Sequence, residues 1–227
     1  MTNRRPLTYF DFPPWLPESN LTVYPRLPGI DNKNENEEKI IEAVFKQLRS
    51  LNPSRTVYTD GSASAGTDNG GAGVVITIGD PANLTISQII RRKGARHTSS
   101  YGEETNAMEA AAEMIVETAA ANETIVIGTD SQSLCSALIS GNRDTDRIRK
   151  LFGEADARII VQWMPGHCNI PGNEAADKAA KEATLLPDEF EPKPEHSWLT
   201  EVYCEYSADR EKQISSRLDQ VDLARIR

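Results

Sequence analysis

Apolar stretches alternate with polar breaks through the middle of the chain, and their pattern predicts a mixed α/β domain. Five short stretches are rich in β-branched and apolar residues and are bounded by Gly, Pro, Asn or Asp, as β-strands are. They cover residues 56–59, 73–78, 84–91, 124–129 and 158–163. The first three follow one another through short turns, which predicts an antiparallel meander.

Helical patterns surround and separate the later strands. Apolar residues recur at helical spacing over residues 37–51, 101–120 and 173–183, and a further helix follows Ser131, which suits its N-cap. A short helix can also occupy the charged stretch 142–150. The order of three strands, helix, strand, helix, strand, helix predicts a five-stranded mixed sheet, three antiparallel strands and then two parallel ones, flanked by helices.

The two ends of the chain differ from this central part. Residues 1–35 contain six prolines and are expected to form an extended linker, although several apolar side chains near residues 10–16 could pack on the domain. We therefore divide the chain into three parts. They are a Pro-rich extension with an amphipathic helix (1–54), a central α/β domain (55–186), and a linker with a final helix over about 209–226 (187–227).

The composition indicates the cellular compartment, and the net charge argues against simple binding of nucleic acid. The chain has three cysteines without metal-type spacing. It shows no signal peptide and no apolar run as long as a membrane span, and these features together favour an intracellular protein. The net charge of −9 is unusual for a protein that grips nucleic acid through its phosphates. A polyanion partner would therefore require local basic patches or bound cations.

Two carboxylates come directly after apolar strands. Asp60 follows residues 56–59 and Asp130 follows residues 124–129. An ionised carboxylate beside a buried strand is costly unless a cation or hydrogen-bond donors offset its desolvation. Asp60 is thus either exposed at a sheet end or a metal ligand, and Asp130 is either a metal ligand or the cap of the next helix, a role that Ser131 could also fill.

The helices offer further acidic candidates. Glu104 lies at the head of the row that packs on the sheet, whereas Glu109 is five residues further on and heads a row that resembles a solvated face, so Glu104 is favoured. Asp177 lies near a helix N-terminus, where the helix dipole alone could explain it. His167, in a Pro-Gly loop, would titrate in a range that suits proton transfer if it lies near these carboxylates.

Four acids from separate elements are typical of a site for two Mg²⁺ ions about 4 Å apart, which promote in-line attack on a phosphodiester. Without metal, carboxylates placed so closely would repel one another. The candidate metal ligands are Asp60, Glu104, Asp130 and Asp177.

Four segments in order resemble type 1 ribonuclease H, and most closely the ribonuclease H domain of non-LTR retrotransposon polyproteins. They are Tyr-Thr-Asp-Gly-Ser at 58–62, Ser-Ser-Tyr-Gly-Glu-Glu at 99–104, Thr-Asp-Ser-Gln-Ser at 129–133 and Trp-Met-Pro-Gly-His through Asn-Glu-Ala-Ala-Asp at 163–177. The resemblance covers residues 55–183 and implies a ribonuclease H-like fold. It also implies metal-dependent hydrolysis of the RNA strand of an RNA/DNA hybrid, with Mg²⁺ or Mn²⁺ as cofactor.

The resemblance also implies roles for individual residues. Asp60, Glu104, Asp130 and Asp177 match the family's catalytic, metal-binding tetrad, and His167 matches the loop histidine that assists turnover. By position alone, Ser62 and Asn106 are expected to contact the hybrid. The parent polyprotein would supply a reverse transcriptase as a partner.

Two departures from the family pattern leave alternatives open. The Met108–Glu109 pair imitates one found in some bacterial members, and aligning on it would make Glu109 the catalytic acid. The basic protrusion of bacterial enzymes is missing, which predicts weak hybrid affinity unless Arg91, Arg92, Lys93 and Arg96 form a substitute patch. A catalytically silent module that binds nucleic acid or protein is the competing hypothesis.

Overall fold

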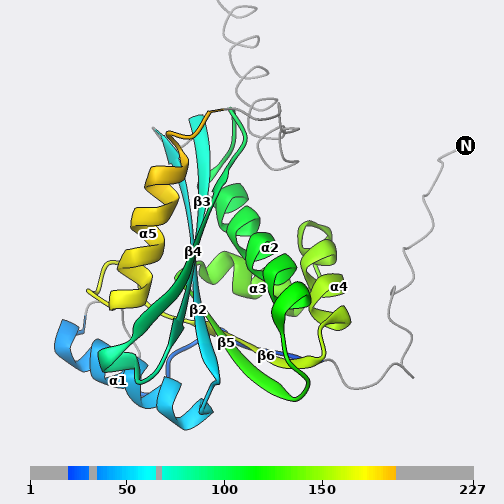
Figure 1. Cartoon of the computed structure of the whole chain (residues 1–227). Coiled ribbons are helices and arrows are strands. Elements are labelled where there is room, and N and C mark those ends of the chain that lie inside the picture. Colours follow the sequence, from blue (N-terminus) through cyan, green and yellow to red (C-terminus); the bar gives the residue numbers. More distant parts are fainter. Residues whose placement is uncertain (1–19, 31–34, 65–67, 188–227) are drawn as a thin grey trace, which may run out of the picture.

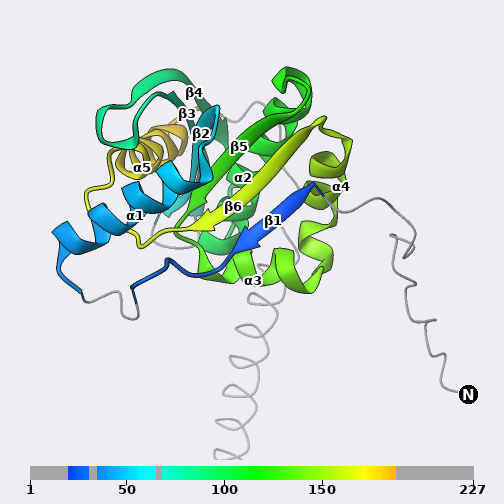
Figure 2. The ribbon, with the colours of Figure 1, turned by 90° about the horizontal axis from the view of Figure 1, so that it is seen from below.

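Six strands form one mixed sheet in the order β1-β6-β5-β2-β3-β4. Figure 1 shows this sheet between its flanking helices, and Figure 2 shows β1 beside β6. The computed structural model describes residues 20–30, 35–64 and 68–187. Strands β2 (Arg55–Ser64), β3 (Asp68–Ile78) and β4 (Thr85–Lys93) are antiparallel, whereas β5 (Glu123–Thr129) and β6 (Ala157–Trp163) run parallel to β2. The predicted meander and the two parallel strands are therefore confirmed.

The sixth strand corrects the prediction of five. Strand β1 (Leu21–Tyr24) lies within the stretch that we expected to be linker, and it pairs in parallel with β6 at the edge of the sheet. Prolines exclude a helix or a central strand but tolerate an edge strand, and four residues between them suffice for one. The side chain of Asn20 secures this strand by donating to the carbonyl oxygens of Phe152, Ala155 and Ala157.

Helices cover both faces of the sheet (Figure 2). Helices α2 (Ser100–Thr118), α3 (Gln132–Ser140) and α4 (Asp146–Glu154) cover one face, and α1 (Glu37–Leu51) and α5 (Pro171–Ala183) cover the other. Short 3₁₀ turns occupy Pro81–Asn83 and Arg143–Thr145. Ser131 caps α3 by accepting from Leu134 N, as predicted.

Successive residues of the central strands enter two separate cores. Val57, Ile125 and Ile159 pack beneath α2, α3 and α4, while their neighbours Tyr58, Val126 and Ile160 pack beneath α1 and α5. Because both faces are buried, these strands are continuous apolar runs without alternation. A carboxylate that interrupts such a run is therefore held close to the core.

Strand β2 does not end at Asp60 as expected but continues to Ser64. Gly61 pairs with Ala72 of β3 and lies directly beneath the backbone of α2, where a Cβ atom would come within 2.2 Å of Glu103 C and Glu104 N. The glycine therefore permits close packing of helix on strand where a turn was expected.

Some predictions fall outside the described residues. These are the linker after residue 187, the final helix over 209–226, and most of the Pro-rich start of the chain. Among the helices that the structure describes, none is long and apolar enough to cross a membrane.

Candidate active site

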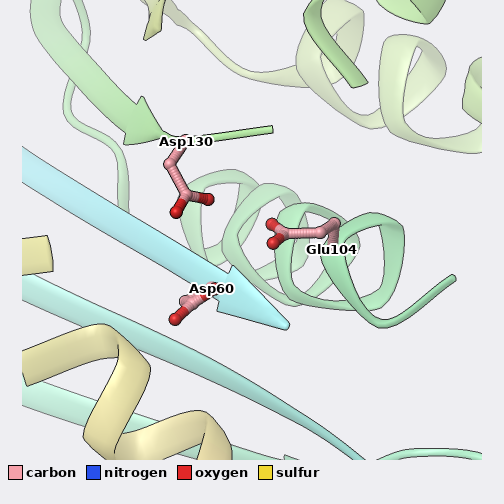
Figure 3. A group of neighbouring side chains, drawn as sticks. All are labelled: Asp60, Glu104 and Asp130. Carbon is pink, nitrogen blue, oxygen red and sulfur yellow. The ribbon is translucent and has the colours of Figure 1, made fainter. Parts of the chain in front are cut away.

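Three carboxylates from three different elements meet at one end of the parallel strands (Figure 3). Asp60 lies in β2, Glu104 in the second turn of α2, and Asp130 directly after β5. One carboxylate oxygen from each lies within 4.8 Å of those from the other two. We call Asp60, Glu104 and Asp130 the three-carboxylate group.

The strand register explains why the two aspartates meet. Tyr58 of β2 pairs with Gly128 of the neighbouring parallel strand β5, so Asp60 and Asp130 each lie two residues beyond a paired position. Glu104 reaches the same place because α2 packs on β2 at Gly61, one residue after Asp60. The group thus follows from the pairing of β2 with β5 and the close approach of α2.

Burial and mutual repulsion give these carboxyl groups unusual affinity for protons. Asp60 is only 8% exposed, and burial, followed by the charges of Asp130 and Asp177, raises its pKa to about 7. Burial and the same kind of repulsion raise the pKa of Glu104 well above its usual range, and burial also raises the pKa of Asp130. Without a cation, the group therefore retains protons at pH values where carboxylates are normally ionised.

The donor set fits a hard divalent cation. Carboxylate oxygens are the ligands that Mg²⁺ prefers. In the part of the chain that the structure describes, Glu104 Oε2 is buried and has no hydrogen-bond partner. A buried acceptor without a donor is costly, and a metal ion would satisfy it.

Asp177 lies close to this group but is not part of it. Its carboxylate forms an ion pair with Lys181 one turn further along α5, with 2.7 Å between Nζ and Oδ2. It is nevertheless near enough to contribute to the raised pKa of both Asp60 and Asp130. Of the four predicted acids, the structure brings three together and places the fourth, Asp177, nearby in an ion pair with Lys181.

The loop that carries His167 packs against Asp130. A Cβ atom on Gly166 would lie 2.2 Å from Asp130 Oδ2, so the loop backbone touches the carboxylate. His167 has a positive φ of 55°, and its charge acts to lower the pKa of Asp130. The predicted proximity of this histidine to the carboxylates is thus observed for Asp130.

The structure separates Glu109 from the three-carboxylate group. Glu109 forms an ion pair with Arg147, with 3.1 Å between Oε1 and Nε, on the side of α2 that faces α4. Glu104, which the apolar stripe favoured, is the acid of α2 that lies beside Asp60 and Asp130.

The two residues expected to contact substrate lie in different surroundings. Ser62 is half-buried in β2, two residues beyond Asp60 and opposite Gly71. Asn106 is two residues beyond Glu104, about 200° around the helix, and its Nδ2 donates to Glu103 Oε2 at 3.0 Å. The structure brings neither side chain into the three-carboxylate group.

Comparison with known proteins decides the family. Residues 52–184 match the family model described as RNase H, and this match spans more than half of the chain. The chain belongs to the RNase H family. Membership supports nuclease chemistry of the RNase H kind, in a family that generally uses divalent metals.

Several solved structures resemble this chain at low sequence identity. RNase H1 of the archaeon Halobacterium salinarum is 23% identical, with 57% of this chain and 96% of that chain covered and a TM-score of 0.48. The foamy viral protease-reverse transcriptase in complex with RNA/DNA hybrid is 20% identical, with 60% and 20% covered and a TM-score of 0.47. The N-terminal RNase H domain of a Mycobacterium tuberculosis protein is 18% identical, with 57% and 92% covered and a TM-score of 0.45. A search of curated proteins found no match, so the family assignment rests on the family model.

The basic residues that could replace the missing protrusion of this RNase H domain are largely engaged. The observed pairs are Arg91 with Glu182, Arg92 with Glu113, and Lys93 with the carbonyl oxygen of Thr184. Each of these contacts satisfies or offsets a positive charge within the protein. The expectation of weak hybrid affinity is therefore retained.

Sequence reasoning missed two residues beside the RNase H site. Trp163 donates its indole N–H to the carbonyl oxygen of Asp130 at 3.1 Å, which ties the end of β6 to the end of β5. Glu103, which the sequence did not single out among the acids of its helix, is only 2% exposed. The glycines that accommodate Glu103 lie in other elements, so no local pattern could have indicated its burial.

Proposed function

We propose that this RNase H domain is a metal-dependent endonuclease that hydrolyses the RNA strand of RNA/DNA hybrids and leaves a 5′-phosphate and a 3′-hydroxyl. The observation that carries the proposal is the three-carboxylate group, with its buried and unsatisfied Glu104 oxygen, in a chain of the RNase H family.

The carboxylates of this group would hold the cations. Asp60 of β2, Glu104 of α2 and Asp130, directly after β5, provide three acidic ligands, and their raised pKa values mean that a cation competes with protons for them. Two Mg²⁺ ions bound here, or Mn²⁺ in their place, would supply Lewis-acid stabilisation of the phosphodiester under attack. Because these residues lie on or beside regular elements of the sheet and helix layers, the ligand oxygens are positioned before the substrate arrives.

His167 is proposed to move the proton. An imidazole can accept a proton during attack or deliver one to the 3′-oxygen as that oxygen leaves. Its place beside Asp130 puts this exchange next to the metal ligands. We expect loss of His167 to slow turnover rather than to prevent metal binding.

Asp177 is proposed as the fourth ligand. Its Oδ2 pairs with Lys181, so binding a cation through this oxygen would exchange the lysine for the ion. The ion pair is partly exposed, and such pairs contribute little stability, so the exchange is feasible.

The substrate would be recognised chiefly by shape and by its 2′-hydroxyl groups. We propose Ser62 as a contact because it lies in the same strand as Asp60 and is partly exposed. A contact from Asn106 would use its Oδ1, since Nδ2 donates to Glu103. We further propose, from the motif resemblance alone, an origin in a non-LTR retrotransposon polyprotein with a reverse transcriptase as its partner.

The direct test is cleavage of a 5′-labelled RNA/DNA hybrid by the full chain. Duplex RNA, duplex DNA and single strands serve as controls, each in Mg²⁺, Mn²⁺ and EDTA. We expect metal-dependent cutting confined to the RNA strand of the hybrid. A folded protein that binds the hybrid but cuts it in neither metal would favour the silent binding module.

A further inference from the structure

Glu103 is a buried carboxylate immediately before Glu104 in the sequence. It is 2% exposed, and it lies about 100° around α2 from Glu104, so the two side chains leave the helix in different directions. Its Oε1 accepts from Ala95 N at 3.2 Å, and its Oε2 accepts from Asn106 Nδ2 at 3.0 Å. The carboxylate thus links the start of α2 to the segment that follows β4.

Two glycines make the space in which this carboxylate sits. A Cβ atom on Gly70 would lie 2.0 Å from Glu103 Oε1, and one on Gly94 would lie 2.0 Å from Oε2. The N–H of Gly94 donates to the carbonyl oxygen of Gly70 at 2.8 Å, so the two glycines are neighbours across the ladder. Together they form a slot that accepts the carboxylate of Glu103 and has no room for a larger residue at either position.

A third glycine, Gly61, lies where α2 contacts strand β2. The backbone of α2 at residues 103 and 104 lies against Gly61, directly after Asp60. This contact sets the distance between helix and strand, but a helix resting on a glycine can still rotate about its axis. The slot holds Glu103 to one side of that contact and therefore restricts the rotation.

We infer that Glu103 is a positioning residue, whose carboxylate in the slot between Gly70 and Gly94 sets the rotation of α2 that directs Glu104 toward Asp60 and Asp130. The inference rests on the proposed function in so far as the three-carboxylate group binds metal. It also gives Asn106 a role, because its amide provides one of the bonds that hold Glu103 in place.

Two substitutions at position 103 separate this role from simple core packing. Glu103→Gln keeps the size of the side chain and an acceptor for Ala95 N, whereas Glu103→Ala empties the slot. Binding of Mn²⁺ is measured by titration calorimetry without hybrid, together with the Tm of each variant. We expect Glu103→Gln to bind Mn²⁺ within about 3-fold of wild type and Glu103→Ala to bind at least about 10-fold more weakly.

A core variant controls for loss of stability alone. Phe152→Leu truncates a buried residue of α4, which packs on the same face of the sheet as α2 but carries none of the residues of the three-carboxylate group or of the slot. It should lower the Tm and leave the Mn²⁺ affinity unchanged. Should Glu103→Ala not fold, Asn106→Ala removes one bond and leaves the carboxylate in place, and we expect about 3-fold weaker Mn²⁺ binding.

The outcomes distinguish the two proposals. If Glu103→Ala folds and binds Mn²⁺ as tightly as the wild type does, the positioning role is overturned and the nuclease proposal still stands. If Glu103→Ala does not fold, the same affinity in Asn106→Ala has this meaning. A wild-type protein that binds Mn²⁺ and does not cut the hybrid overturns the nuclease proposal, while the ratio between variants still measures the positioning role. A wild-type protein without Mn²⁺ binding overturns both.

Discussion

Asp60 couples the stability of the metal-free protein to pH. Its pKa is about 7 in the folded protein, against an ordinary value of 3.8, so the folded state holds the proton more tightly than the unfolded chain does. Stability from this group is complete below about pH 4 and is lost as pH rises toward 7 and above. Other acids with lowered pKa, such as Asp80 beside Arg49, act in the opposite direction but only as pH falls below about 4.

We therefore predict that the metal-free protein becomes less stable between pH 5 and pH 8. Urea unfolding in EDTA measures the free energy of unfolding across this range, and the loss should be on the order of 2 kcal/mol. Mg²⁺ at millimolar concentration should reduce the loss, because cations replace protons at the carboxylates. A free energy that stays level or rises from pH 5 to pH 8 in EDTA would contradict the assigned electrostatics.

Asp60→Asn should remove much of this loss of unfolding free energy at neutral pH. The amide is close to the carboxyl group in size and carries no charge, so the metal-free variant should be more stable than wild type at pH 7.5. We expect a gain of about 1 to 2 kcal/mol, or roughly 2 to 8 °C in Tm, together with loss of stabilisation by Mg²⁺. Asp68→Asn, in an exposed pair with His97, is the matched control and should change neither quantity much. Equal or lower stability of Asp60→Asn would show that repulsion does not dominate the site.

The residues of the site could be predicted to different extents. Asp60 and Asp130 each come directly after a run of apolar and β-branched residues, and this local contrast is visible in the sequence. Glu104 could be separated from Glu109 because only Glu104 shares a row with the buried residues Ala107 and Met108. Burial of Glu103 depends on Gly70 and Gly94, whose positions become relevant only after the strands have paired.

At the scale of elements, β1 is the main addition to the expected fold. Its four residues carry too little periodicity to be recognised, and the prolines around it favoured a linker. Its place follows from tertiary pairing with β6 and from the bonds of Asn20 to carbonyl oxygens, two of which measure 2.9 Å (Ala155) and 3.1 Å (Ala157). By contrast, α1 was predicted with its observed bounds. Its 15 residues span several helical turns, so its apolar residues repeat often enough for the helical spacing to be recognised.

We predict that Asn20→Ala destabilises the whole protein. The substitution leaves the carbonyl oxygens of Phe152, Ala155 and Ala157 without the amide that bonds them, and partly buried acceptors without donors cost roughly 1 to 3 kcal/mol. Urea unfolding of the full chain measures the change. Asn83→Ala, at an exposed position, is the control and should change stability by less than about 0.5 kcal/mol. If both variants unfold like the wild type, β1 is not an integral part of the folded domain.

At the scale of the molecule, the net negative charge limits the affinity for nucleic acid. The chain carries 34 acidic against 25 basic residues, and Arg91, Arg92 and Lys93 are paired within the protein. Four phosphate contacts from the stretch 91–96 would give a slope of log affinity against log salt of about −3.6. We predict a slope nearer −1, measured by fluorescence anisotropy of a labelled hybrid in EDTA between 50 and 300 mM NaCl. A slope steeper than about −3 would show that these basic residues leave their partners to bind the hybrid.

The central claim is that Glu104, with Asp60 and Asp130, forms a metal site that hydrolyses the RNA strand of a hybrid. Cleavage rates of Glu104→Gln and Glu109→Gln in Mg²⁺, measured beside the wild type, test it most directly. The two variants make the same chemical change five residues apart in one helix, but only Glu104 lies in the three-carboxylate group. We predict at least a 100-fold loss for Glu104→Gln and less than a 3-fold change for Glu109→Gln. The reverse order, or equal rates in both variants, would contradict the assignment of this site.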